Sequence, residues 1–230
     1  LVSPRRSWPV VQLPGYRTGL LQLPPLRSSQ QRTVSQTKPT TMSSSSGTPY
    51  IFSPADHSHL IPYLAALHAA CISSDRTLAT FLPPLSHEKL LGWWKDCIAE
   101  VTAGTRMMLI LLDESEPGSK PKGTELVGVV MLLMPYSETG PFRGFVEKLL
   151  ISPKFRRRGG ARMLMSALEG EAVRRGRTLL MLDTEAGSPA EDVYKKFGYV
   201  EVGRIPNYGI SPAVPRQLKD EVFFYKQLTK

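Results

Sequence analysis

The chain of 230 residues has a net charge of +9, and 41% of its residues are hydrophobic, which suits one mid-sized domain with an appendage. Its longest apolar runs, 107–112 and 127–134, are far shorter than the ~20 residues of a transmembrane helix, so we expect no membrane partner. The two cysteines, Cys71 and Cys97, show neither CxxC nor Cys/His spacing. This spacing argues against a disulfide framework and against a metal site.

The excess positive charge is concentrated near the N-terminus. Residues 1–55 contain six basic residues and no acid, so the remaining 23 basic and 20 acidic residues give only +3. Residues 1–47 are rich in Ser, Pro and Arg and lack apolar periodicity, which predicts a disordered basic leader before a folded domain at 48–230. Such a leader also resembles a mitochondrial transit peptide, although its prolines break a long helix, and Met42 is an alternative start. We expect a cytoplasmic protein, with mitochondrial import open if the leader is genuine.

Hydrophobic spacing predicts two helices and four strands in the first part of the folded domain. In chain order they are strand 50–53, helix 54–74, helix 87–104 and strands 106–113, 124–135 and 142–152. The second helix has Ser86 as a candidate N-cap and Gly104 as its stop. Because a loop rich in Gly, Pro and Ser joins the first two long strands, we expect a hairpin that the third strand extends into an antiparallel meander.

The pattern then changes to a 3.6-residue period. Helix 159–176 carries its apolar residues on one face and is followed by a buried strand at 178–183. A strand, a helix and a strand of these lengths imply a right-handed parallel crossover. The remaining predicted elements are helix 189–196 and strands 199–205 and 220–228. The sequence therefore predicts an α/β fold with a mixed central sheet and helices on both faces.

The turn before helix 159–176 reads PKFRRRGGARML and packs four arginines around a Gly-Gly pair. The first turn of a helix has unpaired N–H groups and about half a positive charge, and glycine lets an anion approach the backbone. Such a turn can bind phosphate or pyrophosphate, but its spacing is neither Walker A nor the Rossmann pattern. A solvated arginine cluster that merely starts a helix and a nucleic-acid contact are the alternatives.

The segment LLISPKFRRRGGARML resembles motif A of the GNAT superfamily of acyl-CoA N-acyltransferases, which is Gln/Arg-x-x-Gly-x-Gly/Ala after a strand. The order of the predicted elements agrees with that superfamily, which implies a GNAT-like, mainly antiparallel sheet. Three further segments are similar to the tabtoxin-resistance acetyltransferase group: FLPPLSHEKLLGWW, LLMLDTEAGSPAEDVYKKFGYVEVGRIPNYGISP and FFYKQL. The resemblance implies transfer of the acetyl group of acetyl-CoA to a primary amine of a small molecule, and the spacing of the cysteines and histidines already argues against a metal.

The resemblance also implies a cofactor site. The turn and the start of the helix would bind the pyrophosphate of CoA, and the preceding strand would pair its backbone with the pantetheine arm. The candidate cofactor-binding residues are Leu149, Leu150, Ile151, Arg156, Arg157, Arg158, Gly159, Gly160, Ala161 and Arg162.

Two residues are candidates for the proton transfers that aminolysis of a thioester requires. Asp183 ends the strand TLLMLD, where ligands of open α/β sheets gather, and Tyr194 lies on the following helix. In the tabtoxin-resistance group the matching Asp and Tyr are the proposed base and acid. Asp183 could instead cap the next turn, and Tyr194 could be a core aromatic. Glu147 is a rival base, since alternation places it on one strand face with Phe145 and Leu149.

Other functions remain open from the sequence alone. A protein or peptide acetyltransferase would need an open acceptor groove, and a non-catalytic CoA-binding module would bind the cofactor without transfer. The nearly neutral folded part and the lack of aromatic residues among the arginines disfavour a nucleic-acid partner. A homodimer is compatible with the sequence.

Overall fold

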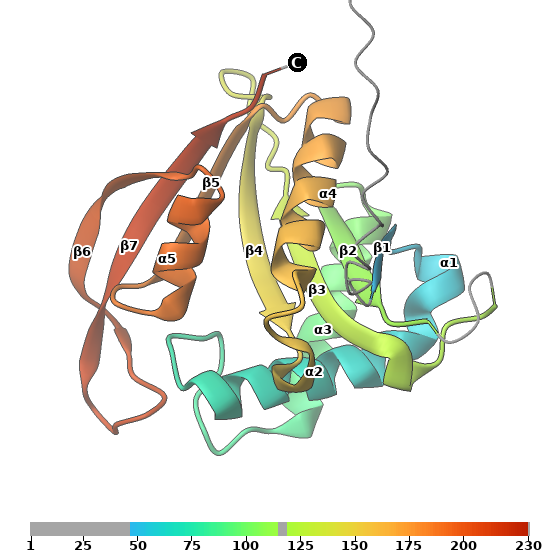
Figure 1. Cartoon of the computed structure of the whole chain (residues 1–230), viewed down its shortest axis with the longest axis horizontal. Coiled ribbons are helices and arrows are strands. Elements are labelled where there is room, and N and C mark those ends of the chain that lie inside the picture. The colour runs from blue at the N-terminus through green and yellow to red at the C-terminus, as the bar shows by residue number, and fades with distance from the viewer. Residues whose placement is uncertain (1–46, 115–118, 230) are drawn as a thin grey trace, which may run out of the picture. The chain divides into compact units, whose positions relative to one another are not determined.

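The computed structural model describes residues 47–114 and 119–229 (Figure 1). The predicted leader, residues 1–47, lies outside the described residues except for Gly47. No helix in the described part combines the length and the apolar character that crossing a membrane requires.

The described residues form one seven-stranded sheet in the order β1-β2-β3-β4-β5-β7-β6. The strands are β1 Thr48–Ile51, β2 Arg106–Leu112, β3 Leu126–Leu133, β4 Arg143–Ile151, β5 Leu179–Glu185, β6 Val200–Ile210 and β7 Leu218–Gln227. Neighbouring strands are antiparallel except β4 and β5, which are parallel. The mixed, mainly antiparallel sheet and the parallel crossover are therefore confirmed.

Five α-helices join these strands within the described ranges. They are α1 Pro54–His57, α2 Ile61–Asp75, α3 His87–Thr102, α4 Gly160–Arg174 and α5 Pro189–Lys196. The predicted N-cap is confirmed, since the Ser86 hydroxyl accepts the backbone N–H of Lys89 at 3.3 Å. The single helix predicted over 54–74 is wrong. A 3₁₀ turn separates α1 from α2, because Pro62 has no N–H to continue the ladder and restarts the helix at its first turn.

Helices cover both faces of the sheet and enclose two separate cores. One core joins the sheet to α4 and α5 through residues such as Leu164, Leu168 and Tyr194. The other joins it to α2 and α3 through residues such as Leu64 and Trp94. Strand β2 is buried at every position, because it lies between the two layers.

Strands β4 and β5 pair over only three residues each and then separate. Arg143–Phe145 pairs with Leu179–Met181, and no pairing continues beyond Phe145 and Met181. Figure 1 shows the two strands close at one end of the sheet and apart at the other. The separation leaves the backbone of the second half of β4 without a strand partner on its β5 side.

A β-bulge in β4 coincides with this separation. Met131 of β3 pairs with Glu147 and Val129 pairs with Leu150, so Lys148 and Leu149 together oppose Val130. Lys148 has a φ of 54°, in the left-handed region that non-glycine residues seldom adopt. The extra residue reverses the alternation, and Leu149 packs in the α4 and α5 core. The prediction that Leu149 shares a face with Glu147 is therefore wrong.

Candidate active site

Motif A forms a tight turn between β4 and α4. Gly159 is the N-cap of α4 with a φ of 84°, and a Cβ there would meet no atom within 4 Å, so the backbone is open to a ligand. A Cβ on Gly160 would lie 2.9 Å from Cδ2 of the buried Leu111, so glycine lets α4 approach the sheet. The first amides of α4 lack helical partners and are positioned to receive an anion.

The four arginines of the motif have different surroundings. Arg156 donates to both carboxylate oxygens of Asp75 at 2.5 and 2.8 Å and to the Ile151 carbonyl at 3.2 Å, so it ties the turn to the end of α2. Arg158 and Arg162 lie 5.0 Å from the ring centres of Phe155 and Phe197. The side chains of Arg157, Arg158 and Arg162 are exposed. An anion in solution can therefore reach these three exposed side chains, whereas Arg156 holds the turn against Asp75.

The three predicted pantetheine-binding residues occupy the end of β4. Their side chains are core residues: Leu149 packs on the α4 side, Leu150 packs on the α2 side, and Ile151 is buried. The part of β4 that has no β5 partner begins after Phe145, so it includes these three residues. The side chains of these residues can therefore pack in the cores while their backbone groups pair with a ligand such as the pantetheine arm.

Asp183 lies inside β5 and does not cap the next turn. It pairs in register with Phe223 of β7, and its side chain is exposed. Because Phe145 pairs with Met181, alternation places Asp183 on the same sheet face as Phe145 and Glu147. That face is the one covered elsewhere by α2 and α3, since Glu147 pairs with the core residue Met131.

Tyr194 lies on the opposite face of the sheet, in the core beneath α5. Its ring packs against Tyr199 and Phe224 with centres 6.0 and 6.2 Å apart. Burial, and then the nearby Asp183 carboxylate, raise the pKa of Tyr194. The residue is 8% exposed, and no hydrogen bond joins its hydroxyl to another described residue. The core-aromatic alternative is therefore correct for the ring.

Glu147 is committed to an ion pair. Arg106 donates to Glu147 at 2.5 Å and to Glu100 of α3 at 2.6 Å, and the Arg106 residue is only 7% exposed. Burial alone would lower the pKa of Arg106, but the hydrogen bonds that it donates to these two carboxylates raise it. Moving Glu147 toward a substrate would leave a buried guanidinium less well paired, which is costly.

Several polar residues lie around Asp183 that were not predicted from the sequence. The ammonium of Lys148 lies 5.6 Å from the ring centre of Trp93, and Glu221 of β7 is buried beside Asp183. Glu185 accepts the backbone N–H of Leu78 at 2.8 Å. On β5, Asp183 and Glu185 occupy alternate positions, which signals a polar strand face, whereas Asp220 and Glu221 of β7 are adjacent and give no such signal. The pairing of the two strands and the bulge at Lys148 could not be derived from that alternation.

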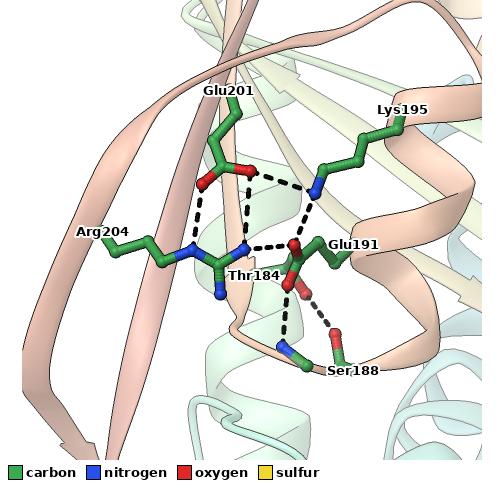
Figure 2. Close-up of polar contacts among 7 residues, drawn as sticks. Thr184, Ser188, Glu191, Lys195, Glu201 and Arg204 are labelled. Atoms are coloured by element: carbon green, nitrogen blue, oxygen red, sulfur yellow. Dashed lines mark hydrogen bonds and ion pairs between the residues drawn. The ribbon is translucent and has the colours of Figure 1, made fainter.

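A polar network fixes α5, the helix that carries Tyr194 (Figure 2). Glu191 accepts the Gly187 N–H at 2.8 Å and Lys195 at 2.6 Å, and it also pairs with Arg204 of β6. Hydrogen bonding, led by Lys195, lowers the pKa of Glu191 to about 2. Glu201 joins both cations at 2.9 and 3.0 Å. The network holds the start of α5 against β6.

Comparison with known proteins agrees with this geometry. The model of the Acetyltransferase (GNAT) family matches residues 85–199, which is half of the chain. The chain therefore belongs to the GNAT family and is an acetyltransferase.

Solved structures share the fold at low sequence identity. A candidate phosphinothricin N-acetyltransferase is 16% identical with a TM-score of 0.62, and the match covers 80% of this chain and 100% of that one. A candidate acetyltransferase from Salmonella typhimurium, solved with its cofactor acetyl-CoA, is 17% identical with a TM-score of 0.56 and coverage of 80% and 95%. A ribosomal L7/L12 alpha-N-protein acetyltransferase in complex with CoA is 16% identical with a TM-score of 0.60 and coverage of 79% and 94%.

Proposed function

We propose that this enzyme transfers the acetyl group of acetyl-CoA to a primary amine of a small molecule by direct attack. The observation that carries the proposal is the separation of β4 and β5, which opens the sheet between Asp183 on one face and Tyr194 on the other. The cofactor would enter from the α4 and α5 side. The amine would enter from the α2 and α3 side and meet the thioester in the gap.

The cofactor contacts follow from the motif turn and the open side of β4. The amides from Arg157 to Ala161 would bind the pyrophosphate, with Arg157, Arg158 and Arg162 as electrostatic support and Arg156 holding the turn in place. The backbone of Leu149, Leu150 and Ile151 would pair with the pantetheine arm. A backbone N–H aimed at the thioester oxygen would stabilise the developing charge by ~3 kcal/mol.

The proton transfers divide between the two faces. Asp183 would accept a proton from the acceptor ammonium, which must become neutral to attack. The hydroxyl of Tyr194 would donate to the departing thiolate. Because its pKa is raised, Tyr194 stays protonated and stabilises the thiolate chiefly as a hydrogen-bond donor. Glu147 stays the rival base, although its ion pair with Arg106 makes it less available.

The α2 and α3 side of the sheet, from which the amine would enter, is called the acceptor face. The segment that covers part of this face favours a small substrate over a protein. The segment between α2 and α3 reaches β5, where Leu78 donates its backbone N–H to Glu185 at 2.8 Å. The Leu78 side chain also lies against β6, because a Cβ on Gly209 would be 2.8 Å from Leu78 Cδ2. These contacts restrict the groove that an extended peptide would need. An amino-acid-like amine of the kind handled by the tabtoxin-resistance group is our proposed acceptor class.

Two wider expectations stand as proposals. We place the enzyme in the cytoplasm, and we keep a homodimer as its assembly. Strand β6 ends the sheet and exposes Val200, Val202 and Tyr208, a surface that a second subunit could cover. Light scattering of the purified chain tests the assembly, and a monomer mass across the accessible concentrations contradicts it.

A thiol-release assay tests the proposed function. Acetyl-CoA is offered with amino acids, polyamines and a lysine peptide, and the acetylated product is identified by mass spectrometry. We expect release well above background with a small amine and little with the peptide. Release at the background rate with every amine contradicts the enzyme and supports a CoA-binding module, and preference for the peptide supports protein acetylation.

A further inference from the structure

Three carboxyl groups gather on the acceptor face of β5 and β7. The strand register places Glu221 directly opposite Glu185 and diagonal to Asp183 on the same face. Glu185 has partners, since it accepts the Leu78 N–H at 2.8 Å and lies 3.7 Å from the ammonium of Lys219. Asp183 is exposed toward the acceptor side. Glu221 differs from both because it is only 4% exposed.

One oxygen of Glu221 has an environment that an ionised carboxylate does not tolerate. Its Oε2 atom is fully buried and has no hydrogen-bond partner among the described residues, and the register of β5 and β7 places its carboxyl group diagonally beside that of Asp183. An unpaired buried carboxylate costs several kcal/mol, whereas a protonated one can donate to a neighbouring carboxylate. The geometry therefore indicates one proton between two carboxyl groups.

The surrounding charges act in the same direction. Burial, followed by the hydrogen bond and charge of Asp183 and the charge of Glu185, raises the pKa of Glu221 to about 8, and Lys148 on β4 opposes this only partly. On β7 itself, Lys219 is engaged with Glu185. On β6 the residue opposite Glu221 is Ile205, which carries no charge.

We propose that Asp183 and Glu221 act as one carboxyl dyad that receives the proton of the acceptor ammonium, with Asp183 touching the amine and Glu221 as its positioning residue. This inference rests on the proposed function and extends it from a single base to a pair. A lone aspartate, with an ordinary pKa of ~3.9, is a weak acceptor for the proton of an ammonium near ~10. A pair of carboxyl groups holds its last proton more tightly than a lone aspartate does, so it is better matched to that transfer.

The proton balance is simple. The fully ionised dyad takes one proton from the ammonium and becomes singly protonated, with the proton bridging Asp183 and Glu221. The neutral amine attacks the thioester carbonyl, the C–N bond forms, and the C–S bond breaks as the tetrahedral intermediate collapses. The second N–H proton leaves with the CoA thiolate beside Tyr194. Water then removes the bridging proton, so one proton is released for each amide formed.

The first test does not depend on activity. Glu221→Gln keeps a hydrogen-bond donor toward Asp183 but cannot ionise. In the wild type the folded pKa of Glu221 lies above the unfolded value of ~4.3, so stability should fall as pH rises from about 5 to about 8. The melting temperature of Glu221→Gln minus that of the wild type should therefore increase over this range. The same difference measured in the Asp183→Asn background, between the double variant and Asp183→Asn alone, should increase less.

A matched control uses the other face of β7. Glu169 pairs with Lys226 at 2.8 Å, away from the dyad, so Glu169→Gln should give a difference in melting temperature that changes little with pH. If the melting-temperature difference for Glu221→Gln is equally independent of pH, the proposal that Asp183 and Glu221 share a proton is wrong.

The second test asks whether the dyad serves the reaction. The ratio of kcat/KM for the wild type to that for Glu221→Gln, measured with the best amine of the panel, should rise about tenfold from about pH 6.5 to about pH 8.5. Titration of the free amine is common to both enzymes and cancels in the ratio. A ratio that is constant with pH overturns the role of Glu221. Failure of every amine with the wild type contradicts the proposed function instead, and the melting temperatures still decide whether the proton is shared.

Discussion

Tyr194 combines a buried ring with a hydroxyl to which we assign proton donation, and the two can be tested separately. Tyr194→Phe removes only the hydroxyl and keeps the ring that packs against Tyr199 and Phe224. We expect kcat to fall about 100-fold, because the departing thiolate loses its donor. The free energy of unfolding should change by less than about 0.5 kcal/mol, because the ring contacts remain.

Tyr199→Phe is the matched control for that substitution. The Tyr199 ring packs against Tyr194, and its ring is approached by the Lys226 ammonium at 5.4 Å. We give it no role in transfer, so its kcat should stay within about twofold of the wild type. Equal losses of kcat in the two variants would show that packing, and not the Tyr194 hydroxyl, determines the rate.

At the scale of an element, α4 depends on one glycine to approach the sheet. A Cβ on Gly160 would lie 2.9 Å from a side chain of Leu111 that is 1% exposed and cannot move aside easily. Gly160→Ala should therefore destabilise the protein by about 1–3 kcal/mol, measured by urea denaturation. It should also weaken binding of CoA, because the first turn of α4 shifts.

Gly170 provides the comparison within the same helix. A Cβ there would meet only the end of Arg174, at 3.9 Å, and the backbone is ordinary helix. Gly170→Ala should stabilise the protein by about 0.5–1 kcal/mol through the lower entropy of the unfolded chain. If both variants change stability in the same direction, close packing at Gly160 is not what requires glycine.

The network at the start of α5 should make stability depend on pH. The folded pKa of Glu191 is depressed to about 2, so its contribution is present above the unfolded pKa of ~4.3 and is lost as pH falls through the folded value. Glu191→Gln should cost about 1 kcal/mol at neutral pH, discounted for the exposed cations, and less at about pH 3. Urea denaturation at both pH values measures this.

Asp192 lies next to Glu191 on α5 but is exposed. Asp192→Asn should change the free energy of unfolding by less than about 0.5 kcal/mol at either pH. A cost for Glu191→Gln that does not decrease toward low pH would show that its charge is not the source of the stabilisation.

At the scale of the whole molecule, local patterns predicted the elements better than their pairing. The cap at Ser86 and the period of helix 159–176 depend on neighbouring residues, and both predictions are confirmed within a few residues. The family resemblance rested on a contiguous motif and is confirmed at the level of GNAT. Its subgroup stays a prediction.

Long-range features of the site could not be predicted from such patterns. The bulge at Lys148 depends on how β3 pairs with β4, and the approach of Glu221 to Asp183 depends on the register of β5 and β7. Strand register follows from packing of the whole sheet, which a single sequence does not reveal. The candidate base and acid could be named from the sequence, but their positions on opposite faces could not.

The central claim is that acetyl transfer joins a cofactor on one face of the sheet to an amine on the other, with Asp183 on the amine side. Asp183→Asn, assayed with the best amine of the panel in single turnover and with acetyl-CoA by calorimetry, tests it most directly. We expect transfer to slow by at least about 100-fold while the Kd for acetyl-CoA stays within about twofold. Transfer at nearly the wild-type rate, or a loss explained by weaker acetyl-CoA binding, would contradict the account.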